Sequence, residues 1–134
     1  MFNMGQTVSK ETAKQLNPVV LAFIGDAVYS LYVREKLALE HTYKAGELNK
    51  LAIKEVRATA QAEFLHKIVD ILTEEELSIF KRARNAKKGT KAKSASVAEY
   101  NTSTGFEALV GYLYLTGEYA RLNEILHYGE TNEG

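Results

Sequence analysis

The feature that most limits the fold of this chain is the spacing of its apolar residues, which recur at steps of three and four along almost the whole sequence. That spacing places apolar side chains on one side of an α-helix, whereas strands favour alternation, and runs of alternating β-branched residues are few here. A chain of 134 residues has the length of one domain and can bury a sizeable core. We therefore expect an all-α fold in a single domain over residues 1–134, with its core at about 16–128.

Capping and breaking residues predict about six helices. Asn17 is suited to cap a helix that has Pro18 in its first turn, and Thr73 with Glu76 forms a predicted capping box. Glycines at 46, 89 and 117 separate the later elements. The predicted helices are Lys10 to Gln15, Pro18 to about Leu39, Glu47 to about Leu72 with a break near Val56, Thr73 to about Ala86, about Val97 to Leu115, and a last one to about Tyr128.

Several classes of site and location are excluded by what the sequence lacks. There is no cysteine, so disulfides, thiolate zinc sites and thiol catalysis are absent, and the three histidines are too scattered for a metal cluster. The first residues lack the apolar core of a signal peptide, so we expect a cytoplasmic protein. The longest apolar stretch, Pro18 to Val33, is short for a bilayer span of about twenty residues and contains Asp26, which predicts a buried helix instead.

Two carboxylates stand alone in strongly apolar segments. Asp26 is the only ionisable acid between Pro18 and Val33, and Glu107 is the only one in TGFEALVGYLYL. Burial of an isolated carboxylate raises its pKa and is costly unless a cation or hydrogen-bond donors compensate. We expect both acids to be buried and to need a partner.

A shared metal ion would compensate both carboxylates at once. Oxygen ligands without cysteine or clustered histidine favour Mg²⁺, or Mn²⁺, over zinc. The alternative is that each acid is satisfied separately by a helix terminus, a tyrosine or an arginine, and the spacing leaves both interpretations open. Small residues beside the acids would let the two helices approach closely: Ala22, Gly25 and Ser30 on the first, and Gly105, Ala108 and Gly111 on the second.

The charge of the chain is zero in sum but uneven along the sequence. Seventeen Lys and Arg balance seventeen Asp and Glu, so the total gives no sign of a nucleic-acid partner. Seven of those cations nevertheless lie between Lys81 and Lys93, and no acid occurs from Leu77 to Ala98. We name residues 81–93 the basic arm and expect it to bind a polyanion through Lys81, Arg82, Arg84, Asn85, Lys87, Lys88, Lys91 and Lys93.

The composition of the basic arm favours a duplex as its target. No aromatic residue interleaves with the cations, which argues against a stacking platform for single strands and favours contacts to the phosphate backbone. About four to six such contacts would give sequence-independent binding that weakens with salt. The alternative is that the cations form a solvated surface.

The segment LAFIGDAVYSLYVR around Asp26 resembles the signature helix of the ribonuclease III catalytic domain, and STGFEALVGYLYL resembles the second acidic motif of that family, with Glu107 in the metal-binding position. VRATAQAEFL and KRARNAKKG add two further matches. The resemblance is strongest to the Mini-III ribonucleases, which lack a separate double-stranded-RNA-binding domain. It covers about residues 16–128.

Larger ribonucleases of this type carry further acids at positions occupied here by Val19, Ala22 and Thr104. Mini-III proteins share this reduced set of acids, so the departure does not imply loss of activity. A single Mg²⁺, completed by waters and the scissile phosphate, is therefore the simpler expectation for each site.

The resemblance implies a Mg²⁺-dependent endoribonuclease that cleaves double-stranded RNA, leaves 5′-phosphate ends, and acts in maturation of the large-subunit (23S) ribosomal RNA precursor. Asp26 and Glu107 would bind the metal and serve catalysis. The resemblance also implies a homodimer in which Phe23 packs into the partner subunit. The alternatives are a non-catalytic RNA-binding or ribosome-associated module with the same fold, and a helical interaction protein without an RNA partner.

Overall fold

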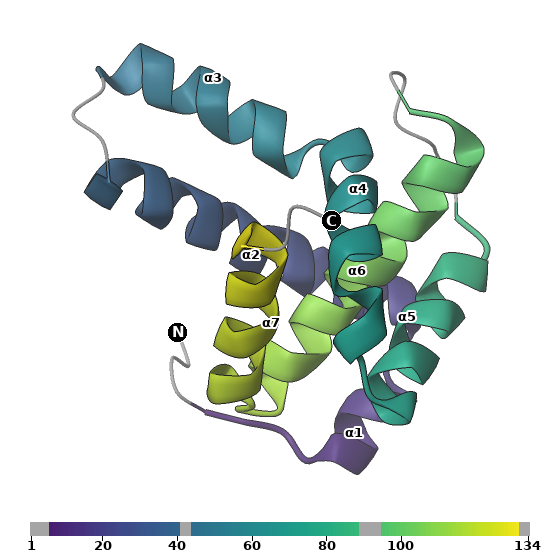
Figure 1. Cartoon of the computed structure of the whole chain (residues 1–134). Helices are drawn as coiled ribbons and strands as arrows, with labels where there is room; N and C mark the ends of the chain where they lie inside the picture. The colour runs from purple at the N-terminus through teal and green to yellow at the C-terminus, as the bar shows by residue number, and fades with distance from the viewer. Residues whose placement is uncertain (1–5, 41–43, 89–94, 132–134) are drawn as a thin grey trace.

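The computed structural model describes residues 6–40, 44–88 and 95–131, and every regular element in these ranges is a helix (Figure 1). The all-α prediction is therefore confirmed. The elements are α1 (Lys10–Gln15), α2 (Pro18–Glu40), α3 (Ala45–Val56), α4 (Ala58–Ile68), a 3₁₀ turn (Val69–Ile71), α5 (Glu74–Asn85), α6 (Val97–Leu115) and α7 (Tyr119–Thr131).

The helix boundaries follow the capping residues closely. Thr73 and Glu76 form the predicted capping box at the start of α5. The break predicted near Val56 is present, because Arg57 is extended (φ −68°, ψ 156°) between α3 and α4. The last helix is longer than expected and continues to Thr131, past the predicted end at Tyr128.

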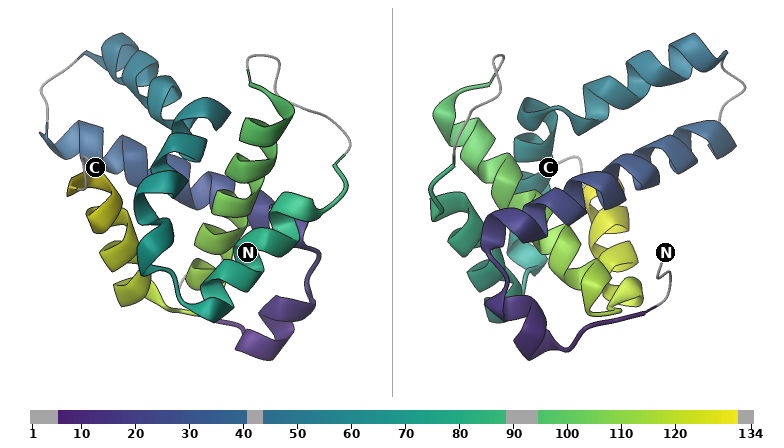
Figure 2. Two further views of the ribbon diagram at one scale, coloured as in Figure 1. Left: turned by 45° about the vertical axis from the view of Figure 1, so that its right-hand side comes forward. Right: turned by 180° about the vertical axis from the view of Figure 1, so that it is seen from behind.

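Helix α6 lies at the centre of the arrangement, with α2, α4, α5 and α7 packed around it (Figures 1 and 2). Every residue from Ser103 to Leu113 is buried except Glu107, which is partly exposed. A helix that is covered on all sides can be apolar all round, and this explains the unbroken apolar character of the segment. Glu107 thus interrupts the most buried helix of the described chain.

Helix α2 is equally apolar but is buried on one side only. Its inner side includes Leu21 and Val33, which are fully buried. Its outer side leaves large apolar residues uncovered, which corrects the prediction of a fully buried helix. We name this outer side the α2 apolar stripe; it consists of Val20, Phe23, Ala27 and Leu31, of which Phe23 is 77% exposed.

Helices α2 and α3 extend together beyond the rest of the molecule (Figure 2).

Among the described residues, no helix combines the length and the apolar character needed to span a bilayer. The sequence-based rejection of Pro18 to Val33 as a membrane span agrees with that finding.

Candidate active site

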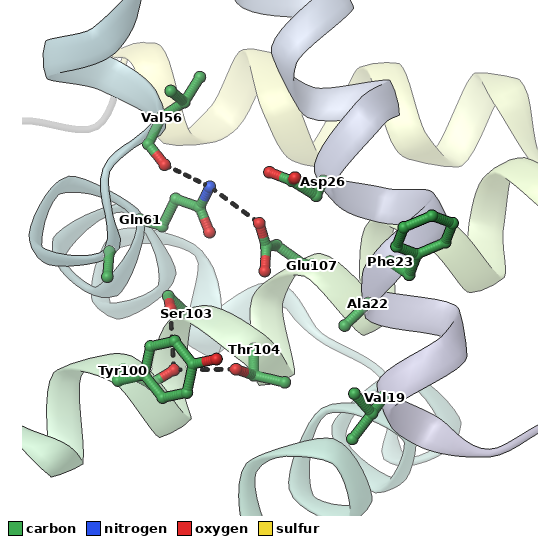
Figure 3. Close-up of a pocket in the computed structure, with 11 residues that line it drawn as sticks. Val19, Ala22, Phe23, Asp26, Val56, Gln61, Tyr100, Ser103, Thr104 and Glu107 are labelled. Carbon is green, nitrogen blue, oxygen red and sulfur yellow. Dashed lines mark hydrogen bonds between the residues drawn. The ribbon is translucent and has the colours of Figure 1, made fainter. Parts of the chain in front are cut away.

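A cavity of about 370 Å³ opens between α2, α6 and the start of α4 (Figure 3). Asp26 lines it from α2 and Glu107 lines it from α6. The structure therefore brings the two isolated carboxylates of the sequence into one site. The remaining lining residues are apolar or neutral: Val19, Ala22, Phe23, Val56, Ala58, Gln61, Tyr100, Ser103 and Thr104.

Two glycines set how closely α2 and α6 approach. A Cβ at Gly25 would overlap the backbone oxygen of Glu107, and a Cβ at Gly111 would overlap the backbone oxygen of Leu21. The two helices therefore cross with their backbones in contact, which only glycine permits at these positions. Because Asp26 directly follows Gly25, this crossing places the Asp26 carboxylate next to that of Glu107.

The two carboxylates have different environments. Burial raises the pKa of Glu107 to about 9, and Asp26 adds to the increase through a hydrogen bond and its charge, while a hydrogen bond from Gln61 acts in the opposite direction. Asp26 itself is exposed, which corrects the expectation that both acids are buried. The physical reason is that Asp26 lines an open cavity between the helices, where its carboxylate stays in contact with solvent.

In the described part of the chain, no cation forms an ion pair with either acid. Neither Asp26 nor Glu107 forms an ion pair within residues 6–40, 44–88 and 95–131. Two adjacent carboxylates without a cation, one of them partly buried, make a site that favours the binding of a positive ion.

The oxygen atoms available at the cavity fit a hydrated Mg²⁺ or Mn²⁺. Magnesium keeps several waters and is usually bound by only one or two carboxylates. Asp26 and Glu107 supply two, and no cluster of three or more His, Cys, Asp or Glu suited to a metal occurs in the described part of the chain. The Thr104 hydroxyl, which also lines the cavity, donates to the backbone carbonyl of Tyr100 at 3.0 Å.

Gln61 belongs to this site although the sequence analysis gave it no role. It is 1% exposed, and its Nε2 donates to the carbonyl of Val56 at 2.8 Å and to Oε2 of Glu107 at 3.3 Å (Figure 3). A signal was present in the sequence, since Gln61 shares the buried side of α4 with Leu65 and Ile68. A glutamine at such a position needs hydrogen-bond partners, and these come from α3 and α6.

Three cations of the basic arm have partners within the protein. Arg82 donates to the carbonyl of Lys14 at 3.0 Å, and the Arg84 guanidinium lies 5.4 Å from the centre of the Phe80 ring. Helix α5 ends at Asn85, so Lys88 lies beyond the helix. The Lys88 amine folds back to donate to the carbonyls of Arg84 and Ala86, at 2.9 and 2.7 Å.

The other members of the basic arm are more available to a ligand. Lys81, Asn85 and Lys87 are exposed, although Asn85 also accepts a hydrogen bond from Arg84 at 3.1 Å. Lys91 and Lys93 lie outside the described residues. In the described part, Lys81 and Lys87 are thus the cations of the arm best placed for contacts with phosphate.

A second group of cations, which the sequence analysis did not single out, lies on α3 and the break that follows it. Lys50 and Lys54 are exposed and four residues apart, which puts them on one side of α3, and Arg57 is exposed in the break. Of the three, Arg57 adjoins the cavity, because Val56 and Ala58 on either side of it line the cavity.

Comparison with known proteins gives a consistent result. The family model for the ribonuclease III domain matches residues 19–118. The chain is 50% identical to a Mini-ribonuclease 3 of Thermoanaerobacter sp. (strain X514), over 90% of this chain and 85% of that protein. It is 44% identical to a Mini-ribonuclease 3 of Clostridium tetani (strain Massachusetts / E88), over 93% of this chain and 83% of that protein.

The fold also has a match among solved structures. A crystal structure of a protein from Fusobacterium nucleatum superimposes with a TM-score of 0.78 at 34% sequence identity. The match covers 84% of this chain and 92% of that one. The helical arrangement in Figure 1 is therefore shared with a protein of related sequence.

Proposed function

Because the chain belongs to the ribonuclease III family, and within it to the Mini-ribonuclease 3 proteins, we propose that it cleaves double-stranded RNA with the help of Mg²⁺ held by Asp26 and Glu107. The chain is an endoribonuclease, and we propose that residues 1–134 act as a single catalytic domain. The observation that carries the proposal is the convergence of the two carboxylates on one cavity, where neither is paired with a cation of residues 6–40, 44–88 or 95–131.

The residues of the cavity account for binding and orientation of the metal. Asp26 and Glu107 are the charged ligands, with Mn²⁺ as a substitute for Mg²⁺. When bound, such an ion activates water for attack on phosphorus and stabilises the negative charge that develops on the phosphate. The Glu107 side chain has to be ionised to serve as a ligand, so binding of the metal displaces the proton that burial favours. By family resemblance the products carry 5′-phosphate and 3′-hydroxyl ends.

We propose that the basic arm and the cations on and directly after α3 bind the duplex. Lys81 and Lys87 are exposed on or beyond α5, Lys50 and Lys54 are exposed on α3, and Arg57 is exposed beside the cavity. Contacts of this kind go to phosphates and carry no sequence information, which suits a nuclease that recognises a duplex. Asn85 would contribute a hydrogen bond to the sugar, and Lys91 and Lys93 would extend the arm.

We propose that the protein acts as a homodimer through the α2 apolar stripe. Three of its four residues are large and apolar: Val20, Phe23 and Leu31 are 47%, 77% and 64% exposed. A contiguous exposed apolar surface on one helix is typical of an interface between equivalent subunits. Phe23 also lines the cavity, so a partner on the stripe would stand at the edge of the site. Two such sites in one dimer could address the two strands of a duplex.

The proposed substrate is a duplex in the precursor of large-subunit (23S) ribosomal RNA, which rests on the resemblance to Mini-III proteins. Action on a ribosomal precursor places the enzyme in the cytoplasm.

The proposal is tested by incubating the protein with a long RNA duplex, in Mg²⁺ and in EDTA. Fragments with 5′-phosphate ends should appear only with Mg²⁺. Asp26→Asn should abolish cleavage and leave binding of the duplex largely intact, because it removes a metal ligand without touching the exposed cations. Asp70→Asn is the matched control, since Asp70 is an exposed carboxylate in the turn between α4 and α5.

Each other outcome selects a different function. Cleavage by Asp26→Asn at the wild-type rate would refute the proposed metal site. Binding of the duplex by the wild-type protein without cleavage would identify a non-catalytic RNA-binding module. If the wild-type protein neither binds nor cleaves the duplex, the remaining interpretation is an interaction protein with no RNA partner.

A further inference from the structure

The Gln61 amide connects the Glu107 carboxylate to the end of α3. Val56 is the last residue of α3, so its carbonyl is one of those that a helix leaves without an internal partner. The Gln61 Nε2 donates to this carbonyl and to Oε2 of Glu107, at 2.8 and 3.3 Å. One NH₂ group therefore joins three helices: α3 through Val56, α4 through Gln61 itself, and α6 through Glu107 (Figure 3).

The orientation of this amide is fixed by its partners. Both atoms facing Nε2 are acceptors, so turning the amide over would place Oε1 against two oxygens and lose both hydrogen bonds. The bond to a backbone carbonyl does not depend on the state of any side chain. Gln61 is thus anchored at one end by the backbone and directs its second N–H at Glu107.

The other atom of the amide is left without a partner. Among the described residues, Oε1 of Gln61 is the buried side-chain polar atom that makes no hydrogen bond. An unpaired buried acceptor is unfavourable, and a methionine or leucine would fill the same space without that cost. The amide is therefore explained by what its donor does for Glu107.

We propose, on the premise of the metal-dependent nuclease above, that Gln61 is a positioning residue which holds the Glu107 carboxylate in its metal-binding orientation. A glutamate has three rotatable side-chain bonds, so its carboxylate can take several orientations unless a neighbour such as Gln61 holds it. Hydrogen bonds from neighbours that fix a ligand typically change metal affinity by about 10–100-fold when they are removed. Gln61 does not touch the metal in this scheme and acts only through Glu107.

The direct test is the binding of Mn²⁺ and Mg²⁺ to Gln61→Met without RNA, by calorimetry. Methionine keeps the length of the side chain and lacks the donor, so the dissociation constant should rise by about 10–100-fold. In cleavage assays the Mg²⁺ concentration for half-maximal rate should rise in parallel, while the rate at saturating Mg²⁺ stays close to that of the wild type. Gln15→Met is the matched control, because Gln15 is an exposed glutamine of α1.

A measurement on the unaltered protein covers the case in which Gln61→Met does not fold. The chain has three glutamines, Gln6, Gln15 and Gln61. With ¹⁵N-labelled glutamine, the side-chain amide signals of Gln6 and Gln15 are identified by replacing each with methionine, which leaves that of Gln61. The Gln61 signal should move on titration with Mg²⁺, whereas that of Gln15 should not.

The outcomes separate this inference from the proposed function. If the wild type binds Mg²⁺ and cleaves duplex RNA, but a folded Gln61→Met binds Mg²⁺ within twofold of the wild type, then the positioning role is overturned and the nuclease stands. A Gln61 signal that does not respond to saturating Mg²⁺ overturns it as well. If the wild type neither binds a divalent cation nor cleaves, the proposed function fails, and the inference fails with it.

Discussion

Replacement of Glu107 by glutamine should stabilise the protein in the absence of metal, and by more at pH 7 than at pH 5. In the folded chain, burial and Asp26 raise the pKa of Glu107 to about 9, against an ordinary value of 4.5. Between these two values the folded state binds a proton that the unfolded state does not. The stability contributed by this proton is fully present below pH 4.5 and is lost as the pH rises towards 9.

The size of the effect follows from that difference. Each pH unit in this range changes the free energy of unfolding by about 1.4 kcal/mol. At pH 7 the wild-type protein therefore loses at most about 3 kcal/mol relative to pH 4.5, whereas Glu107→Gln has no proton to bind. Glutamine resembles the protonated acid, because its NH₂ can donate to Asp26 and its oxygen can accept from Gln61. The advantage of the variant should then grow by about 2–3 kcal/mol from pH 5 to pH 7.

The assay is urea denaturation in EDTA at the two pH values. Comparing the same two proteins at both pH values cancels any effect of the substitution that does not depend on pH. Glu63→Gln, which alters an exposed glutamate of α4, is the control and should show no such growth. Addition of Mg²⁺ should reverse the order, because binding stabilises the wild type and not the variant. A difference between Glu107→Gln and wild type that is the same at pH 5 and pH 7 would refute the reasoning.

Three further predictions concern the helix crossing, the basic arm and the α2 apolar stripe. Gly25→Ala should destabilise the fold by about 1–3 kcal/mol or more, because its Cβ would overlap the backbone of Glu107. Gly46→Ala is the control, which should stabilise α3 by about 0.5–1 kcal/mol because there is open space around Gly46. Equal melting temperatures of the two variants would contradict the close crossing of α2 and α6. Replacing four residues of the basic arm with alanine should weaken duplex binding and reduce its dependence on salt concentration. The four residues are Arg82, Arg84, Lys87 and Lys88. If the logarithm of affinity falls with the logarithm of salt concentration as steeply as in the wild type, the RNA binds elsewhere. Phe23→Asp should give a folded monomer in sedimentation experiments, since its side chain is 77% exposed in the single chain, and a dimer at micromolar concentration would exclude the stripe as the interface.

The features of the fold that could be predicted from the sequence are those that neighbouring residues determine. The capping box of Thr73 and Glu76 is an example, because both partners lie within one turn of α5. The second capping box, of Ser96 and Glu99, has the same local signature, and α6 begins at Val97, where the sequence predicts a helix to begin.

Burial could not be predicted in the same way, because it depends on what covers a helix. The apolar segments that became α2 and α6 look alike in sequence, and yet only α6 is enclosed on all sides. Helical spacing placed the small residues on one side of each helix, but it did not indicate which element each of them contacts. Gly105 faces Phe80 of α5, whereas Gly111 meets α2. The role of Gln61 could not be predicted for the same reason, because its hydrogen-bond partners come from α3 and α6 and no local pattern indicates them.

The position of Phe23 ties the proposed dimer to the proposed chemistry. Phe23 belongs to the α2 apolar stripe and also lines the cavity that holds Asp26 and Glu107. A second subunit on the stripe would therefore remove water beside the exposed Asp26, and lower solvation strengthens its attraction to a cation. It follows that Phe23→Asn, which disrupts the stripe without adding a charge at the cavity, should lower the affinity for Mg²⁺ as well as the affinity between subunits, although Asp26, Glu107 and Gln61 are unaltered. A monomer that binds Mg²⁺ as tightly as the dimer would show that the cavity is complete in one chain.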